Sequence, residues 1–398
     1  MASLEVRPDV VCLSHLRWGF VHQRPQHLMS RFGRRSRVFF CEEPVLGEAV
    51  RPRLEVKAAS EGVFVVQPLL PARLEPEAVE IVQRFLLAVM MRERDVRSYV
   101  LWYYTPLALS YTQSFAPAAV VYDCMDELTG FKGASAELPR RERELFARSD
   151  LVFTGGHSLY EAKRGLHSRV YAFPSSVDVS HFARARSLRG APEPEDQRML
   201  PHPRVGFMGV IDERLDVELL DYVARERPGL QIVLAGPVVK IDPASLPRRP
   251  NVHYLGAKSY DELPAYLAGW DAALLPFARN DATRFISPTK TPEYLAAGRP
   301  VVSTPIHDVV RTYGEAGLVR IAATPAAFAR EIDAALASDT SDERLWQRVD
   351  EHLRGLSWDH TWAAMDALLQ EVLEEKATAM GRPPRGRRPR SAPAKELE

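Results

Sequence analysis

The stretch Ser287-Pro-Thr-Lys-Thr-Pro-Glu-Tyr-Leu-Ala-Ala-Gly-Arg-Pro-Val-Val-Ser303 carries the strongest local pattern in the chain. It predicts a polar loop, a short helix over 289–297, a stop at Gly298 and a buried strand from Val301. A helix N-terminus presents unpaired N–H groups and the positive end of a dipole, which together attract anions. Lys290 stands in the first turn, where the dipole alone would favour an acid. We therefore expect Lys290 to face a bound anion such as a diphosphate.

Glu293 follows Lys290 by three residues and lies on an adjacent face of the same expected helix. A carboxylate in this place can accept hydrogen bonds from the hydroxyl groups of a sugar or a ribose. The alternative is a solvated Lys and a Glu on an ordinary surface helix. These two residues alone do not decide between the two interpretations.

Length and composition indicate a two-domain globular protein. The chain has 398 residues, and single hydrophobic cores stop growing at about 250–300 residues. Apolar residues make up 46% and charged residues 26%, and the formal net charge is zero. A neutral chain produces no overall field that favours nucleic acid as a partner. The cysteines Cys12, Cys41 and Cys124 lie in apolar runs without metal-ligand spacing, so we expect reduced core residues of a cytoplasmic protein.

Short apolar runs alternate with helical segments in both halves of the chain. We expect strands over 10–13, 38–41, 99–103, 120–122, 151–153, 204–211, 230–235, 252–255 and 271–275. This rhythm argues for parallel, doubly wound sheets. The predicted fold class is therefore α/β, with two Rossmann-like domains that face each other across a cleft, a common place for a ligand.

Changes in composition set the expected domain boundaries. Residues 1–180 form the first domain, and residues 181–203, which mix charges and prolines without periodicity, form a linker. Residues 204–375 form the second domain, from which the last helix can pack back on the first domain. Residues 376–398 form a basic tail that we expect to be disordered.

Two segments leave membrane contact open. The basic tail can meet acidic lipid headgroups instead of remaining free in solution. The apolar segment 79–91 is followed by Arg92 and Arg94, and fits a buried amphipathic helix better than a helix on a membrane surface. We therefore expect a cytoplasmic protein, with peripheral contact at the inner membrane face as an alternative.

Five segments of the second half resemble the donor-binding half of GT-B glycosyltransferases, which have two Rossmann-like domains and use nucleotide sugars. These segments are 206–216, 233–237, 252–256, 271–276 and 288–302. Within that class the chain is similar to the bacterial teichuronic-acid-type (TuaH-like) branch. That similarity rests on Arg24-Pro-Gln-His-Leu28 and on the acidic turn Tyr122-Asp-Cys-Met-Asp-Glu127. The resemblance covers nearly all of residues 5–375.

The resemblance implies a hexosyltransferase of cell-surface polysaccharide synthesis. Its donor would be a nucleoside-diphosphate sugar bound by the second domain, and its acceptor a saccharide or lipid-linked saccharide bound by the first. It implies retention of anomeric configuration and no cofactor. Lys290 and the amides near Thr289 would hold the diphosphate, Glu293 would hold the ribose or sugar, and glycines would flank phosphates and base. The implied donor residues are Gly209, Arg214, Gly236, Gly256, Ser287, Thr289, Lys290 and Glu293.

The chain departs from the pattern of the class at two places. Many retaining members carry a second Glu eight residues before the position of Glu293, where this chain has Phe285. Asp281 on the same loop is a candidate replacement. Arg214 also lacks the Lys that usually accompanies it. These departures leave the donor sugar and the anomeric outcome open.

The acceptor side should come from loops at strand ends of the first domain. Asp123 and Asp126 follow an expected strand, and a carboxylate there can orient an acceptor hydroxyl or take its proton. Asp123 has the alternative role of stabilising the turn. His15, Arg17 and Arg24 crowd the first strand-to-helix loop and are candidates for binding phosphate or sugar oxygens.

Metal binding is not expected. The chain has no His/Cys cluster at ligand spacing, and Asp123 and Asp126 lack Asp-x-Asp spacing. Lys290 and the helix dipole would then neutralise the leaving diphosphate. Two alternatives remain: a sugar-nucleotide epimerase of the same architecture, and a degenerate protein that only binds a nucleotide sugar. The base, the sugar, the acceptor and the oligomeric state are not determined by the sequence.

Overall fold

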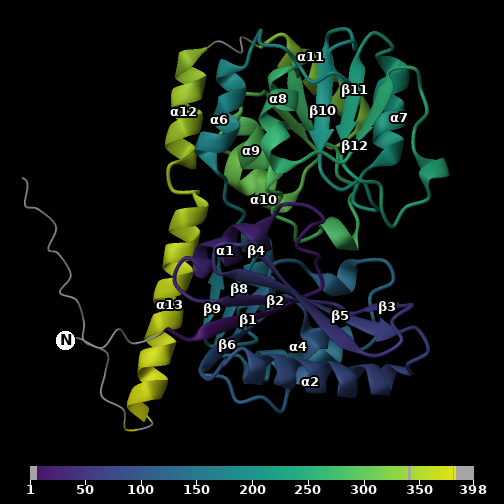
Figure 1. Ribbon diagram of the computed structural model, residues 1–398. Coiled ribbons are helices and arrows are strands. Elements are labelled where there is room, and N and C mark those ends of the chain that lie inside the picture. Colours follow the sequence, from purple (N-terminus) through teal and green to yellow (C-terminus); the bar gives the residue numbers. More distant parts are fainter. Residues whose placement is uncertain (1–6, 339–341, 380, 382–398) are drawn as a thin grey trace, which may run out of the picture.

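The computed structural model describes residues 7–338, 342–379 and 381. Two α/β domains are stacked on each other, the first below and the second above in Figure 1. This architecture confirms the expected pair of Rossmann-like domains. The tail residues 382–398, for which we expected disorder or lipid contact, lie outside the described residues.

The first domain is built on a mainly parallel sheet in the order β3-β5-β2-β1-β6-β7-β8-β9, with β4 antiparallel to β5. Its strands are β1 (Asp9–Ser14), β2 (Val38–Glu42), β3 (Val45–Gly47), β4 (Arg53–Ser60), β5 (Val63–Pro71), β6 (Tyr99–Tyr103), β7 (Ala119–Cys124), β8 (Leu151–Thr154) and β9 (Val170–Ala172). Its helices are α1 (Arg24–Gly33), α2 (Pro76–Glu93), α3 (Leu109–Thr112), α4 (Leu138–Arg148), α5 (His157–Lys163) and, from the end of the chain, α13 (Trp358–Ala379).

Helices cover both faces of this sheet, which explains its continuous apolar strands. Along β1, Val10 and Cys12 join the core under α1 and α13, whereas Val11 and Leu13 join the core under α2 and α4. Helix α2 buries Leu87 and its neighbours against the sheet but leaves two large apolar side chains exposed, Ile81 and Phe85.

The second domain has a fully parallel sheet in the order β12-β11-β10-β13-β14-β15, which is the strand order of dinucleotide-binding folds. Its strands are β10 (Arg204–Met208), β11 (Gln231–Ala235), β12 (Val252–Gly256), β13 (Ala272–Leu275), β14 (Val301–Ser303) and β15 (Arg320–Ile321). Its helices are α6 (Val179–Ser187), α7 (Val217–Glu226), α8 (Leu263–Ala268), α9 (Lys290–Ala296), α10 (His307–Val309), α11 (Pro325–Leu336) and α12 (Glu343–Leu353).

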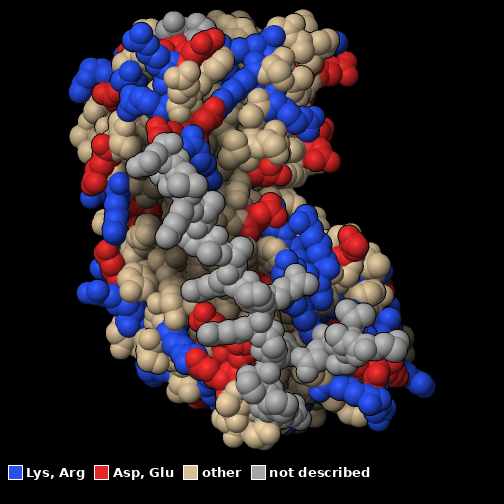
Figure 2. Space-filling model, turned by 90° about the vertical axis from the view of Figure 1, so that its left-hand side faces the viewer, with Lys and Arg blue, Asp and Glu red and all other residues tan. Residues whose placement is uncertain are grey.

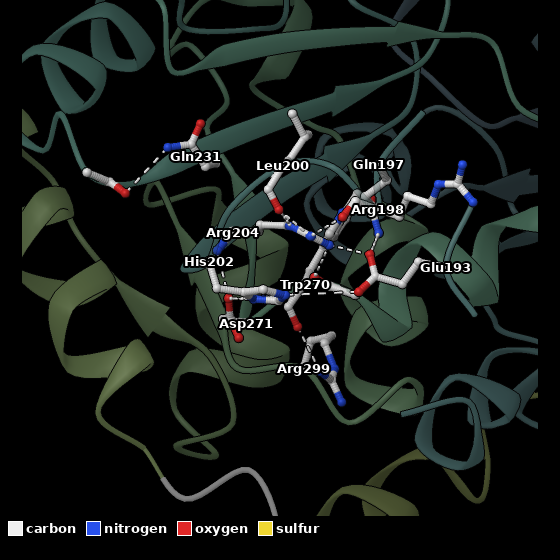
Figure 3. A network of polar contacts seen from close by, with 12 residues as sticks. Glu193, Gln197, Arg198, Leu200, His202, Arg204, Gln231, Trp270, Asp271 and Arg299 are labelled. Atoms are coloured by element: carbon white, nitrogen blue, oxygen red, sulfur yellow. Dashed lines mark hydrogen bonds and ion pairs between the residues drawn. The ribbon is translucent and has the colours of Figure 1, made fainter. Parts of the chain in front are cut away.

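The stretch 181–203, which we expected to be a linker, is part of the second domain. Most of it after α6 forms no regular element, but Phe182 and Ala185 of α6 belong to the second domain's core. The following segment is joined to β10 and β13 by the polar contacts drawn in Figure 3. Buried Arg204 donates to the carbonyl oxygen of Leu200 and pairs with Glu193, and Trp270 Nε1 donates to Gln197 Oε1 at 2.9 Å. Composition suggested a linker because this segment is held by single polar contacts, near in the chain for Arg204 and distant for Trp270, which leave no periodic pattern in the sequence.

The end of the chain returns to the first domain. Helix α12 lies beside the second domain and α13 runs along the first (Figure 1). Trp358, Met365 and Leu369 of α13 are buried in the first domain's core. The helix extends to Ala379, beyond the boundary that we expected at 375. None of the described helices is long and apolar enough to cross a membrane.

The face that carries α12 and α13 shows two lobes with a notch between them in Figure 2. Lys and Arg are interspersed with Asp and Glu over much of this face, as the zero net charge of the chain leads one to expect. Contacts cross between the domains: Asp308 accepts hydrogen bonds from the backbone N–H groups of His157 and Ser158, each at 2.9 Å, at the start of α5. On another loop, Lys132 N donates to Glu213 Oε1 at 2.9 Å.

Candidate functional site

A cavity lies between the domains, where the carboxyl ends of the two parallel sheets face each other. Loops after β1, β7 and β8 line it from the first domain, and loops after β10, β11, β12 and β13 line it with α9 from the second. Ligands of doubly wound folds bind at this edge. Nine of the candidate residues line the cavity: Arg24, Asp126, Gly209, Arg214, Gly236, Ser287, Thr289, Lys290 and Glu293.

Two glycines let the backbone and Lys290 approach closely at the ends of β10 and β11. Gly209 and Gly236 have φ values of +142° and +159°, which disfavour other residues. A Cβ atom at Gly236 would lie 1.8 Å from the carbonyl oxygen of Gly209, and one at Gly209 would lie 2.4 Å from Lys290 Cε. The glycines therefore make the space in which the Lys290 side chain lies.

Lys290 is the first residue of α9 and brings a positive charge into this restricted space. Desolvation lowers its pKa and the neighbouring Arg214 lowers it further, whereas Glu293, Asp212 and Asp126 raise it. Among the described residues Lys290 has no hydrogen bond or ion pair within 4.0 Å. An anionic ligand would relieve the cost of holding this cation out of water.

Glu293 is buried in the same cavity, with 8% of its surface exposed. Desolvation raises the pKa of its carboxyl group to about 7, and the charge of Lys290 opposes this shift. No described residue donates a hydrogen bond to its side chain. Glu293 is thus an acceptor without a protein donor, as a residue that binds ligand hydroxyl groups should be.

Arg214 is held by a neighbour that we did not predict. Its Nε and Nη2 atoms donate to the carboxylate of Asp212 at 3.0 and 2.7 Å, and Asp212 is buried. The guanidinium also lies 5.6 Å from the ring centroid of Phe131 in the first domain. Arg214 therefore lines the cavity with a fixed orientation and contacts both domains.

Asp126 reaches the cavity from the first domain. Its carboxylate has no hydrogen bond from a described residue, although its backbone oxygen accepts one from Cys124. Desolvation raises its pKa, while the positive charges of Arg214, Arg24 and Lys290 lower it. A free carboxylate opposite the expected diphosphate site is suited to orient an acceptor hydroxyl or to take its proton.

Asp123 is placed differently from our expectation. It is fully buried, and both of its oxygens accept hydrogen bonds from Arg24, at distances of 2.8–3.2 Å. Arg24 also donates to the carbonyl oxygen of Phe173 at 2.7 Å. The geometry argues against the catalytic role considered for Asp123: its carboxylate positions Arg24, is fully buried and does not line the cavity.

Three further candidates do not line the cavity. His15 is largely enclosed, and desolvation, together with the charge of Lys240, lowers its pKa to about 4. Arg17 donates to Glu42 Oε2 at 3.0 Å and to the carbonyl oxygen of Glu43 at 2.6 Å. Gly256 is exposed and turns the chain with a φ of +71°, whereas the next two residues reach the cavity. Proximity in sequence to a strand end did not reveal which way these residues point.

The loop that carries Phe285 lies against the first domain. Phe285 packs on that domain's core and does not line the cavity. The backbone of Asp281 lies close to Gly130 of the first domain, but its side chain is exposed and does not line the cavity. We expected Asp281 to be a candidate replacement for the missing carboxylate, and its position outside the cavity corrects that expectation. Asp126 is the carboxylate that the first domain contributes to the cavity.

Sequence reasoning missed several lining residues. Lys258 and Tyr260 follow β12, and Ser175 follows β9. Ser175 also donates hydrogen bonds from its backbone N–H group to Ser287 Oγ and from its hydroxyl group to the carbonyl oxygen of Ser287, which links the two domains within the site. Their common signal is a position shortly after a parallel strand, which we applied only to some of the strands.

Two parallel, doubly wound domains with a ligand cavity between their strand ends define the GT-B fold of glycosyltransferases. Residues 202–338 match the family model described as "Glycosyl transferases group 1". Over 220 residues the chain is 26% identical to a Bacillus subtilis (strain 168) protein named as the teichuronic acid biosynthesis glycosyltransferase TuaH. That match covers 51% of this chain and 55% of TuaH, so it spans about half the length of the relative.

Solved structures share the whole arrangement. Sucrose-phosphate synthase from Thermosynechococcus elongatus matches with a TM-score of 0.69 and 14% identity, over 92% of this chain and 99% of that one. HepE of Anabaena, in complex with UDP and glucose, matches with a TM-score of 0.66 and 11% identity, over 91% and 99%. At these identities the likeness establishes the fold. In sequence, residues 202–338 resemble the group 1 glycosyl transferases, and about half of the chain resembles TuaH.

Proposed function

We propose that the protein transfers a hexose from a nucleoside-diphosphate donor to a saccharide or lipid-linked saccharide acceptor in cell-surface polysaccharide synthesis. The observation that carries the proposal is the cavity's arrangement of unpaired groups, with Lys290 and Glu293 on one domain and Asp126 on the other. Two structural neighbours support a nucleotide-sugar donor: HepE of Anabaena in complex with UDP and glucose, and an E. coli trehalose-6-phosphate structure bound with UDP-2-fluoro glucose. The reaction would take place in the cytoplasm, at the inner membrane face when the acceptor is lipid-linked.

In this mechanism the acceptor oxygen bonds to the anomeric carbon on the face from which the diphosphate departs, as the bond from that carbon to the diphosphate breaks, so that the configuration is retained. Lys290 and the N–H groups at the start of α9 stabilise the charge that develops on the leaving diphosphate. Asp126 orients the acceptor hydroxyl and takes its proton, a role that its raised pKa favours. The proposal includes retention of configuration and independence of metal ions and cofactors, in line with the resemblance to retaining enzymes.

Incubation of the purified protein with nucleotide sugars, with and without saccharide acceptors, tests the proposal. Transfer would release the nucleoside diphosphate only when an acceptor is present, and NMR of the product would give the anomeric configuration. An epimerase would instead form a new nucleotide sugar without acceptor. A degenerate protein would bind the nucleotide and convert nothing, an outcome that the departure at Phe285 makes worth checking.

A further inference from the structure

Tyr260 belongs to the second domain and lines the cavity where that domain contacts the first. It begins the 3₁₀ helix η4 (Tyr260–Glu262), a few residues after β12. Its ring stacks on His181 of α6 at a centroid distance of 4.2 Å and contacts His22 of the first domain at 4.4 Å. Contacts on both sides hold the ring and therefore fix where its hydroxyl group points.

The hydroxyl group of Tyr260 is buried and has no hydrogen-bond partner among the described residues. Buried hydroxyl groups nearly always have a partner, so an exception needs a reason. Burial raises the pKa of Tyr260, and the negative charge of Glu293 raises it further. The hydroxyl group therefore stays protonated at neutral pH and remains available as a hydrogen-bond donor.

Glu293 complements this donor. Tyr260 and Glu293 line the same cavity, and the negative charge of Glu293 raises the pKa of Tyr260. One offers an O–H group without an acceptor, and the other offers a carboxylate without a donor. Two neighbouring hydroxyl groups on a ring satisfy both, because one can donate to Glu293 while the other accepts from Tyr260. The ribose of a ribonucleoside diphosphate carries such a pair at its 2′ and 3′ positions.

We propose that Tyr260 is a donor-binding residue that, together with Glu293, selects ribonucleoside diphosphates over deoxyribonucleoside diphosphates. This inference rests on the proposed function, since it assumes a nucleotide donor in this cavity. Its consequence is that UDP, GDP or ADP binds more tightly than TDP, which lacks the 2′ hydroxyl group. A site that uses hydrogen bonds to recognise hydroxyl groups rejects analogues without them, because its own polar groups are then left unpaired.

The test uses Tyr260→Phe, which removes the hydroxyl group and keeps the ring that stacks on His181 and His22. Calorimetry measures the dissociation constants of UDP, GDP and ADP for the wild-type protein, and then of the 2′-deoxy and 3′-deoxy analogues of the best ligand. Tyr254→Phe is the matched control, because Tyr254 lies in the same domain, donates to the carbonyl oxygen of Pro247 and does not line the cavity.

We expect Tyr260→Phe to weaken binding of the ribonucleotide about threefold to tenfold, the range for one uncharged hydrogen bond. For the analogue that lacks the hydroxyl group in contact with Tyr260, the variant and the wild type should bind equally. Tyr254→Phe should leave all affinities unchanged.

Unchanged affinity of Tyr260→Phe for the ribonucleotide would overturn this inference but leave the proposed function standing. Equal weakening for the ribonucleotide and both deoxy analogues would also overturn it, because the ring's position and not its hydroxyl group would then matter. If the wild-type protein binds no nucleoside diphosphate at all, the proposed function fails as well.

Discussion

The two edges that face the cavity differ in how their charges are used. On the first domain, Arg24, which lines the cavity, is paired with Asp123, and Arg17 beside it is paired with Glu42. On the second domain, Lys290 and Glu293 have no hydrogen-bond or ion-pair partner among the described residues, and Gly209 leaves space for the Lys290 side chain. Paired charges build the scaffold, whereas unpaired charges in a cavity are available to a ligand. By this criterion Asp126 is the exception on the first domain and belongs with the site.

Exchanging Asp126 for Asn is the strongest way to test this distinction. If Asp126 takes the acceptor proton, Asp126→Asn should lower kcat about 10²–10⁴-fold, the usual contribution of a general acid or base. Donor affinity should be nearly unchanged, because the donor contacts come from the second domain. Steady-state transfer assays and calorimetry with the nucleoside diphosphate measure the two quantities separately.

Asp123→Asn supplies the contrast on the same strand end. It leaves buried Arg24 without its charged partner, so we expect a loss of about 3–5 kcal/mol in stability. A stable Asp123→Asn protein without transfer activity, beside an active Asp126→Asn protein, would show that the two carboxylates have the opposite roles.

The contrast between these two carboxylates also shows which features of the fold and the site could be predicted from the sequence. Strand periodicity predicted both sheets, and the segment around Lys290 predicted a helix and a strand that the structure contains as α9 and β14. The sequence placed Asp123 and Asp126 on one loop but could not show that only one has a buried arginine partner. Such pairing depends on contacts between residues that are about 100 positions apart in the chain. The position of Tyr260 shortly after β12 is a local signal, but the ring contacts with His181 and His22 that place it in the cavity are between distant residues and could not be read from the sequence.

Substitution of Lys290 tests whether an unpaired charge on the second domain binds the ligand. Lys290→Ala should weaken binding of the nucleoside diphosphate by about 1.5–3 kcal/mol, the range for hydrogen bonds to charged groups. Because the wild-type cation has no hydrogen-bond or ion-pair partner in the part of the chain that the structure describes, its removal should not reduce stability. Calorimetry and thermal unfolding check the two expectations, and unchanged nucleotide affinity in a folded variant would remove Lys290 from the diphosphate site.

Glu293 gives a prediction that depends on pH. Its folded-state pKa is raised from 4.5 to about 7, so the folded protein binds more protons than the unfolded chain between these values. Stability therefore falls as the pH rises through this window, and the full penalty is present above about pH 7. Glu293→Gln removes the penalty and should be about 1–3 kcal/mol more stable than the wild type near pH 8, with little difference near pH 4.

The same substitution should reduce transfer activity strongly, because glutamine cannot accept hydrogen bonds at both side-chain positions. Denaturant unfolding at the two pH values, together with transfer assays, separates the effects. A Glu293→Gln protein that is destabilised at every pH would show that the carboxylate supports the fold, contrary to its unpaired position in the cavity.

Removal of divalent ions should have the smallest effect. In the proposed mechanism Lys290 and the N–H groups at the start of α9 stabilise the negative charge of the leaving diphosphate. Among the residues that the structure describes, no group of three or more His, Cys, Asp or Glu side chains could hold a metal ion. Transfer rates measured with and without EDTA should then agree within about twofold. If EDTA abolishes activity and Mg²⁺ or Mn²⁺ restores it, these groups are not enough to stabilise the leaving diphosphate. Lys290 would then contribute to donor binding without replacing a metal ion in catalysis.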